Sequence, residues 1–247
     1  MRPNRFALAF FLAVFISVLS GTAQAAPDTL SIDNLSAGAG PNGIPRGWQA
    51  AWFDFCPRRT VYTVENEDGR RVIKASSRNS ASAIYREVSL DPKAFPILMW
   101  RWKVSNIIRK GDERTKEGDD YAARLYVSFE ARPVKMSFGE KLKRRMVKAV
   151  YGKELPGETI EYVWANRAPK NEAFPNPDTD KAMMVAVESG PENAGAWMPE
   201  ARNVYEDYKR LFRAEPPRII YIAIMTDTDN TGSKADAWYG DITFHHE

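Results

Sequence analysis

Near the end of the 247-residue sequence stands IIYIAIMTDTDNTGSKADAWYGDITF (residues 219–244), in which two apolar runs flank a polar segment. Both runs are short and rich in β-branched and aromatic residues, which favour strands. The segment between them holds Asp227, Asp229, Asn230, Thr231 and Gly232, residue types that are typical of turns and loops. This stretch therefore predicts the last two strands of a β-structure, joined at one of its ends.

Similar short runs with alternating character fill much of the remaining sequence. Between residues 61 and 76, VYTVEN and RVIKAS flank an Asp68-Gly69 turn, which predicts a β-hairpin. Five more runs read as strands: ASAIYREVSL, ILMWRWKVS, YAARLYVSFEA, TIEYVWAN and KAMMVAVES. Nine strands without regularly interspersed helices predict an all-β fold, an antiparallel β-sandwich of jelly-roll type.

Two segments have helical spacing instead. Within residues 136–152 an apolar residue recurs at every fourth position, and the remainder of the segment is strongly basic. Residues 199–213 begin with Pro199 and place Glu200 in the expected first turn. We therefore predict two helical insertions in one sandwich domain that spans residues 26–247.

The N-terminus has the pattern of a secretory signal. Arg2 and Arg5 precede an apolar run over residues 6–19, and the small residues Ala23 and Ala25 follow. We expect residues 1–25 to be a signal peptide and the protein to be periplasmic or secreted. The apolar run is shorter than a membrane-spanning helix of roughly 20 residues, so we expect no transmembrane segment after signal cleavage.

Charge and composition narrow the function classes. The net charge of +3 falls to +1 when Arg2 and Arg5 are removed, which does not indicate a nucleic-acid partner. Cys56 is the single cysteine, so no internal disulfide is expected. The two histidines, His245 and His246, lie directly before the last residue, Glu247. This leaves no internal histidine to act as a base. We assign no catalytic residue.

The mature sequence resembles a bacterial family of exported proteins known as domain of unknown function 3047. The resemblance rests on WRWKV (100–104), GDDYAARLYVSF (118–129), YVWAN (162–166), and RNVYEDYKRLF with the final two strands. It implies export and a β-sandwich but no activity. Residues 28–60 are similar to the opening of carbohydrate-binding jelly rolls, in which a first strand pairs with a last strand and a structural calcium ion often lies nearby.

Alternation along the strands also predicts a binding face. If the central strands are neighbours, their outward positions bring together a set of charged and aromatic side chains. The set is Arg101, Lys103, Arg124, Tyr126, Trp164 and Glu188. Aromatic rings beside arginine and carboxylate groups favour a glycan or a cell-envelope component as the ligand. The alternative is an ordinary exposed face whose charges pair across strands.

The loop at 227–232 suggests a metal. Asp227, Asp229 and Thr231 alternate ahead of Gly232, like the first half of a calcium-binding loop. Trp238 occupies the position where an EF-hand has its glutamate, so a structural Ca²⁺ would need a further ligand such as Asp236, Asp241 or Asp33. The alternative is a tight hairpin closed by side-chain to backbone hydrogen bonds.

Together these observations favour an exported, non-catalytic sandwich that binds a glycan or a cell-envelope component. A polysaccharide-acting hydrolase or lyase is an alternative, because tyrosine, arginine and carboxylate groups are present. An envelope assembly or interaction protein, with peripheral contact through the basic helix at 138–151, is another.

Overall fold

The computed structural model describes residues 28–33, 35–40, 43–132 and 156–246. The predicted signal peptide and the predicted basic helix at 136–152 lie outside these ranges. The strands, in chain order, are β1 (Thr29–Ser31), β2 (Gln49–Ala51), β3 (Val61–Glu67), β4 (Arg70–Arg78), β5 (Ala83–Leu90), β6 (Ile97–Val104), β7 (Arg124–Phe129), β8 (Thr159–Ala165), β9 (Ala173–Pro175), β10 (Ala182–Ser189), β11 (Met198–Asn203), β12 (Ile219–Met225) and β13 (Lys234–His245). The α-helix α2 spans Val204–Phe212, and two 3-10 helices span Leu35–Ala37 and Lys116–Gly118.

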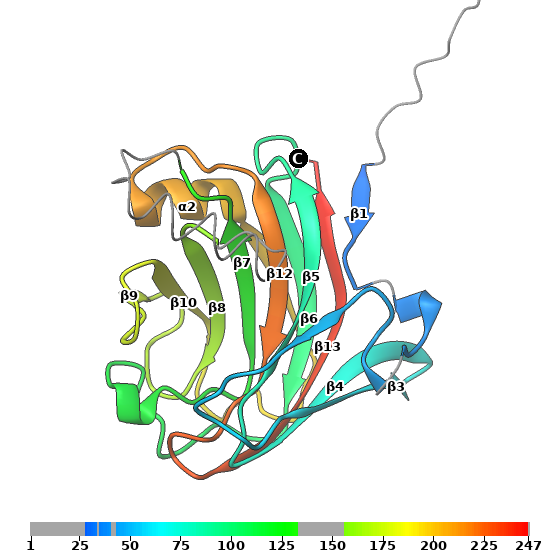
Figure 1. Ribbon diagram of the computed structural model, residues 1–247, viewed down its shortest axis with the longest axis vertical. Coiled ribbons are helices and arrows are strands. Elements are labelled where there is room, and N and C mark those ends of the chain that lie inside the picture. The colour runs from blue at the N-terminus through cyan, green and yellow to red at the C-terminus, as the bar shows by residue number, and fades with distance from the viewer. Residues whose placement is uncertain (1–27, 34, 41–42, 133–155, 247) are drawn as a thin grey trace, which may run out of the picture.

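The strands form two sheets that pack face to face (Figure 1). The six-stranded sheet has the order β11-β6-β13-β4-β3, with β1 paired to β13. The seven-stranded sheet has the order β2-β5-β12-β7-β8-β10-β9. Among the described strands, β8 and β10 run parallel and the other pairs are antiparallel. The predicted sandwich is confirmed, with this one parallel pair as a correction to a wholly antiparallel fold.

The core lies between the sheets and follows from strict alternation. In ILMWRWKV of β6, Trp100 and Trp102 point inward and are almost fully buried. The Trp100 ring lies 5.3 Å from that of Tyr162 on β8, and the Trp102 ring lies 6.0 Å from that of Trp164. Aromatic side chains of this size bury a large apolar area each, so these contacts between the sheets stabilise the sandwich.

Both predicted strand pairings at the edges are present. The β3–β4 hairpin turns at Asp68 and Gly69, whose φ angles of 52° and 77° fit the Asp-Gly turn read from the sequence. The short β1 pairs antiparallel with the end of β13, so the first and last described strands are neighbours, as in the jelly rolls to which the N-terminal segment is similar.

The predicted helix at 199–213 begins later than expected. Residues 198–203 form β11, which pairs antiparallel with β6. The true N-cap is Asn203, whose side chain accepts a hydrogen bond of 2.9 Å from the backbone N–H of Glu206. Pro199 therefore occupies a strand rather than a first helical turn. Within the described ranges, no helix has the length and apolar character needed to cross a membrane.

The 227–232 loop is not a hairpin. It leaves β12 in the seven-stranded sheet and enters β13 in the six-stranded sheet, so it crosses from one layer to the other at one end of the sandwich. This placement agrees with the predicted position at an end of the fold and overturns the alternative of a tight hairpin.

Candidate functional site

The single binding face predicted from the sequence divides between the two sheets. Arg101 and Lys103 lie on β6, on the outer face of the six-stranded sheet. Arg124 and Tyr126 lie on the outward positions of β7 in the seven-stranded sheet. Of the strands expected to be neighbours, β7, β8 and β10 are adjacent, but β6 lies in the other sheet. Alternation assigns a side chain to a face but does not show to which sheet a strand belongs.

Two other predicted residues lie inside or at the edge of the sandwich. The Trp164 side chain is fully buried in the core and donates a hydrogen bond of 3.1 Å from Nε1 to the carbonyl of Gly190. Glu188, also buried, pairs with the Lys170 ammonium and accepts a 3.1 Å hydrogen bond from Asn193. Neither residue shares a face with Arg101 or Arg124, so neither belongs to one continuous surface with them.

The outer face of the six-stranded sheet carries a transverse row of alternating cations and indoles. Lys74 on β4 is opposite Trp238 on β13, and Trp238 is opposite Lys103 on β6. Trp197 precedes Met198, the partner of Trp102, and so extends the row to β11. We call Lys74, Trp238, Lys103 and Trp197 the tryptophan–lysine row.

Contacts within the row are cation–π contacts. The Lys103 ammonium lies 4.3 Å from the centre of the Trp238 ring and 5.4 Å from that of Trp197. The Lys74 ammonium lies 5.6 Å from the Trp238 ring. The Arg101 guanidinium lies 4.1 Å above the Trp197 ring. Each indole therefore lies beside at least one flexible cation, an arrangement that orients the rings on the surface.

The cations of this face are also paired with carboxylates. Lys103 forms an ion pair of 2.6 Å with Glu67, Lys74 one of 3.3 Å with Glu65, and Arg101 one of 2.6 Å with Asp241. The row thus combines aromatic planes with both hydrogen-bond donors and acceptors, and its charges are balanced.

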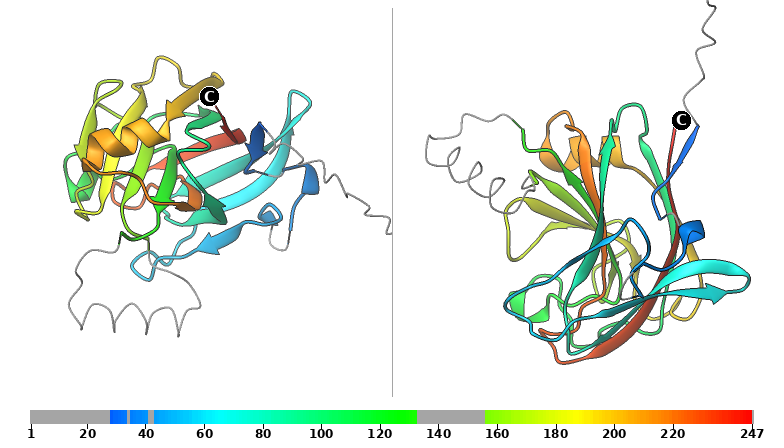
Figure 2. Two further views of the ribbon diagram at one scale, coloured as in Figure 1. Left: turned by 90° about the horizontal axis from the view of Figure 1, so that it is seen from above. Right: turned by 45° about the vertical axis from the view of Figure 1, so that its right-hand side comes forward.

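The Lys103–Glu67 pair joins two strands of this face that are not neighbours. Lys103 is on β6 and Glu67 is on β3, and β13 and β4 lie between them. Neighbouring strands are about 4.8 Å apart, so β6 and β3 would be roughly 14 Å apart in a flat sheet with side chains perpendicular to it. The 2.6 Å contact is therefore made by the ends of two long side chains above β13 and β4, and Figure 2 shows the β3–β4 hairpin extending away from the seven-stranded sheet.

Trp197 and Trp238 were missed as candidate ligands in the sequence. Their indole Nε1 atoms are covered by neighbouring side chains and have no hydrogen-bond partner among the described residues. Period-two alternation in AWYGDITF placed Trp238 outside, but its neighbours depend on the pairing of β13 with β4 and β6. The loop position of Trp197, before β11, carried no such signal.

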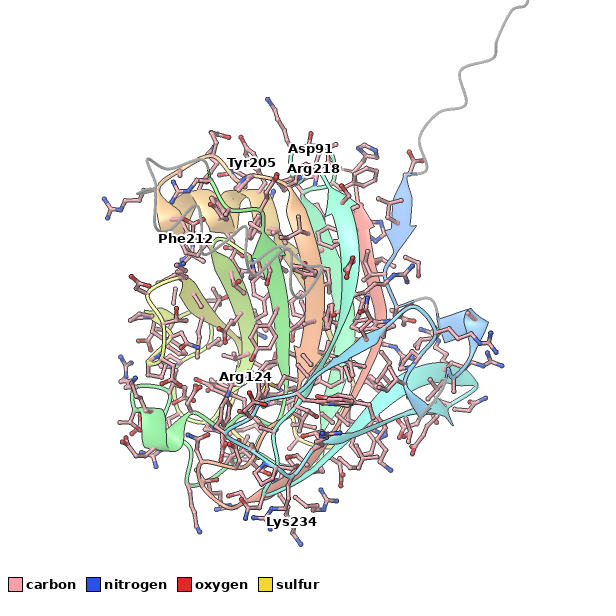
Figure 3. The ribbon with its side chains drawn as sticks, viewed as in Figure 1. Asp91, Arg124, Tyr205, Phe212, Arg218 and Lys234 are labelled. Atoms are coloured by element: carbon pink, nitrogen blue, oxygen red, sulfur yellow. The ribbon has the colours of Figure 1, made fainter. Side chains whose placement is uncertain are left out.

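Arg124 is the centre of a buried charge cluster at the lower end of β7 (Figure 3). Its Nε donates a hydrogen bond of 3.0 Å to Asp227, and its Nη2 pairs with the second oxygen of the same carboxylate. Its Nη1 lies 3.3 Å from Asp119 and 3.7 Å from Glu161. The guanidinium also lies 4.2 Å from the centre of the Tyr121 ring. One buried cation therefore faces three buried carboxylates.

The three buried carboxylates around this one cation have raised pKa values. Burial raises the pKa of Glu161 to about 7, although Arg124 lowers it. Burial likewise raises the pKa of Asp119 and of Asp227, against the opposing effect of Arg124. One Glu161 oxygen has no hydrogen-bond partner among the described residues. Because an unpaired buried charge is costly, this cluster favours a proton or another cation.

The predicted metal ligands are partly brought together. Asp227 and Asp229 join Asp120 in a group whose carboxylate oxygens lie within 4.8 Å of one another. Thr231 instead supports Asp120, because its backbone N–H and hydroxyl donate hydrogen bonds of 2.7 and 2.6 Å to that carboxylate. Asp241 is not near the loop; it pairs with Arg70 and Arg101 on the six-stranded sheet. Asp33 does not join the group either, because its carboxylate accepts a hydrogen bond from the backbone N–H of Ile242 on β13.

Asp119 and Asp120 reach this region together because the backbone is not a strand there. Asp119 follows the 3-10 helix Lys116–Gly118 and has φ −75° and ψ 52°. Strand alternation would have sent the two carboxylates to opposite faces. The kinked backbone instead lets Asp119 contact Arg124 and Asp120 contact the 227–232 loop.

Among solved structures, the neighbours of this fold are carbohydrate-binding modules. A mutant of CBM29-2, a family 29 carbohydrate-binding module, aligns over 87% of this chain and 90% of its own, with 10% identity and a TM-score of 0.34. A CBM29-2 mutant complexed with mannohexaose has 10% identity over 83% of this chain and 86% of its own, with a TM-score of 0.32. A CBM4 structure has 12% identity over 83% of this chain and 97% of its own, with a TM-score of 0.34. These TM-scores lie below 0.5, so a ligand has to be argued from the side chains of this chain.

At the sequence level, residues 46–243 match the family described as "Protein of unknown function (DUF3047)". A comparison with curated proteins finds no match. The matched residues include both sheets apart from β1 and the last two residues of β13.

Proposed function

The chain belongs to the DUF3047 family, and we propose that it is an exported protein that binds a glycan or a glycan-bearing component of the cell envelope through the tryptophan–lysine row. The observation that carries this proposal is the row itself, because it places two indole rings among paired lysine and arginine side chains on the outer face of the six-stranded sheet. The signal-like N-terminus supports the exported location.

The chemistry of the row suits sugars. Indole planes offer apolar surfaces for the faces of pyranose rings, and the lysine and glutamate groups can donate to and accept from hydroxyls. The buried, unpartnered Nε1 atoms of Trp197 and Trp238 are donors that ligand hydroxyls would satisfy if neighbouring groups move on binding. The balanced charges of Lys103 with Glu67 and Lys74 with Glu65 favour a neutral glycan.

Binding of the mature protein to a glycan array, followed by isothermal titration with the best ligand, tests the proposal. Trp238→Ala should weaken binding roughly tenfold, because loss of a stacking plane removes about 1 kcal/mol or more. Lys234→Ala, which removes an exposed lysine on the same strand outside the row, should leave affinity unchanged. The proposal is wrong if no glycan binds, or if both variants retain full affinity.

We further propose that a structural calcium ion binds near the 227–232 loop, with Asp120 in place of the predicted Asp241. The proximity of the Asp120, Asp227 and Asp229 carboxylates supports this choice of ligands. Arg124 already neutralises part of the charge of Asp227, so the ion would share that carboxylate with the guanidinium.

A further inference from the structure

A second aromatic surface lies in the segment between β2 and β3. Trp52 is 60% exposed and Phe55 is 76% exposed, the two highest values among the exposed aromatic side chains described. The Phe53 and Phe55 rings are stacked, with centroids 5.2 Å apart and planes 8° from parallel. Large aromatic side chains left in solvent next to one another commonly mark an interaction site.

Contacts with the rest of the fold hold the segment between β2 and β3 in place. Gln49–Ala51 pairs with β5 on one side, and the Thr60 hydroxyl donates a hydrogen bond of 2.7 Å to the Thr226 carbonyl on the other. Between them, the buried Cys56 packs against Ala81 and Met225, and its thiol donates to the Arg58 carbonyl at 3.2 Å. Fixing both ends and the middle lowers the entropy that the segment would lose on binding.

The charge of this surface is not balanced, in contrast to the tryptophan–lysine row. Arg58 and Arg59 are exposed, and the Arg59 guanidinium lies 3.8 Å from the centre of the Trp52 ring. Neither arginine forms an ion pair with another described residue, while Asp54 is the one acidic residue of the segment. A positive surface that also carries aromatic planes fits an anionic ligand with flat apolar faces.

We propose that residues 52–59, the aromatic–arginine platform, bind an anionic polysaccharide. Trp52 and Phe55 would stack against sugar rings, and Arg58 and Arg59 would pair with carboxylate or sulfate groups in forked geometry. Asp54, which is exposed and lies between Trp52 and Phe55 in the sequence, argues against insertion into a lipid bilayer, where a carboxylate is costly, and offers an acceptor for sugar hydroxyls. This site differs from the proposed row in position, net charge and class of glycan.

Affinity electrophoresis of the mature protein in gels containing polygalacturonate, alginate or chondroitin sulfate, with neutral dextran as the reference, tests this site. We expect retardation by at least one acidic polymer, weakening with added salt, and none by dextran. The double variants Arg58→Gln/Arg59→Gln and Trp52→Ala/Phe55→Ala should each lose roughly tenfold or more in affinity. Trp238→Ala should bind as the unchanged protein does, which separates this site from the row.

Three results would overturn the platform. These are no retardation by any acidic polymer, retardation of both double variants equal to that of the unchanged protein, and binding to phosphatidylglycerol vesicles in place of the polymers. Circular dichroism of each double variant, whose altered side chains are all on the surface, checks that it is folded. A platform that binds while the row does not would leave this inference standing and remove the row as the primary site.

Discussion

Arg101 and Arg124 are both outward-facing arginines on inner strands of their sheets, yet their surroundings are opposite. The Arg101 side chain is 14% exposed, lies over Trp197 and pairs with Asp241, which is itself half exposed. The Arg124 side chain is 3% exposed and faces three carboxylates that are nearly as buried. The difference comes in part from the residues just before β7, because Asp119 pairs with the Arg124 guanidinium and the Tyr121 ring lies 4.2 Å from it.

The comparison teaches that a charged residue at an outward strand position can belong to a surface or to an interior. A loop that folds over one sheet creates a second, polar interior outside the apolar core. Charges there are costly to leave unpaired, whereas an exposed ion pair contributes about 0 to 1 kcal/mol. Four experiments test this difference between the two arginines, in order from the largest expected effect to the smallest.

Arg124→Met should destabilise the protein by about 3 to 5 kcal/mol, because it removes the one described cation from a cluster of buried carboxylates. The free energy of unfolding, measured in urea at pH 8, reports the loss. A change smaller than about 1 kcal/mol would contradict a buried, charge-compensating role for Arg124.

The second experiment tests whether a calcium ion, in addition to Arg124, neutralises the carboxylates of Asp120, Asp227 and Asp229. If the ion binds only the folded state, calcium at 100 times its dissociation constant should stabilise the protein by about 2.7 kcal/mol relative to a chelator. A thermal melt with excess calcium and with a chelator measures this. Asp120→Asn should abolish the difference, and an identical melt of the unchanged protein in both conditions would eliminate the ion.

Glu161→Gln should flatten the pH dependence of stability between pH 5 and pH 8. The pKa of Glu161 is about 7 in the folded protein, above its ordinary value of 4.5. The folded state therefore holds the proton more tightly, so the stability contributed is full below about pH 4.5 and is lost as the pH rises through 7. The effect is on the order of 1 to 3 kcal/mol by urea midpoints.

A matched control for this pH effect is Glu67→Gln on the other sheet. Glu67 pairs with Lys103 on an outer face, so Glu67→Gln removes one ion pair and leaves the buried Glu161 in place. Equal slopes in the unchanged protein and in Glu161→Gln would show that Glu161 keeps its ordinary titration.

Arg101→Met should have the smallest effect on stability, at most about 1 kcal/mol, because its ion pair with Asp241 is partly solvated. Its effect on glycan affinity should be larger than its effect on stability, since it lies over Trp197. Urea unfolding and titration of the same preparation separate the two. A destabilisation equal to that of Arg124→Met would remove the contrast between the two arginines.

The sequence predicted the strands and the sandwich because burial on one face imposes alternation on each strand separately. ILMWRWKV and YAARLYVSFE each show by themselves which side chains point inward. It did not predict that β6 and β7 belong to different sheets, because pairing between distant strands leaves no mark on local periodicity. The same limit hid the tryptophan–lysine row, whose members are distributed over residues 74 to 238.

The kink that turns Asp119 toward Arg124 and Asp120 toward the 227–232 loop could not be predicted either. It depends on a short 3-10 turn in a charged segment, where strand alternation no longer applies. Similarly, MPEARN was interpreted as a helix start because Pro199 and Glu200 suit a first turn. Pairing with β6 outweighs that local preference and makes these residues an edge strand.

The hydrogen bonds from Thr231 to Asp120 join residues that are 111 positions apart, and β1 pairs with β13 across more than 200 positions. During synthesis, the pairing of β1 with β13 cannot form until the last strand has left the ribosome. Because β13 lies between β6 and β4, the six-stranded sheet cannot be completed before this last strand is present, and we expect folding to be slow and cooperative. The two ends of the fold thus make its assembly an all-or-none event.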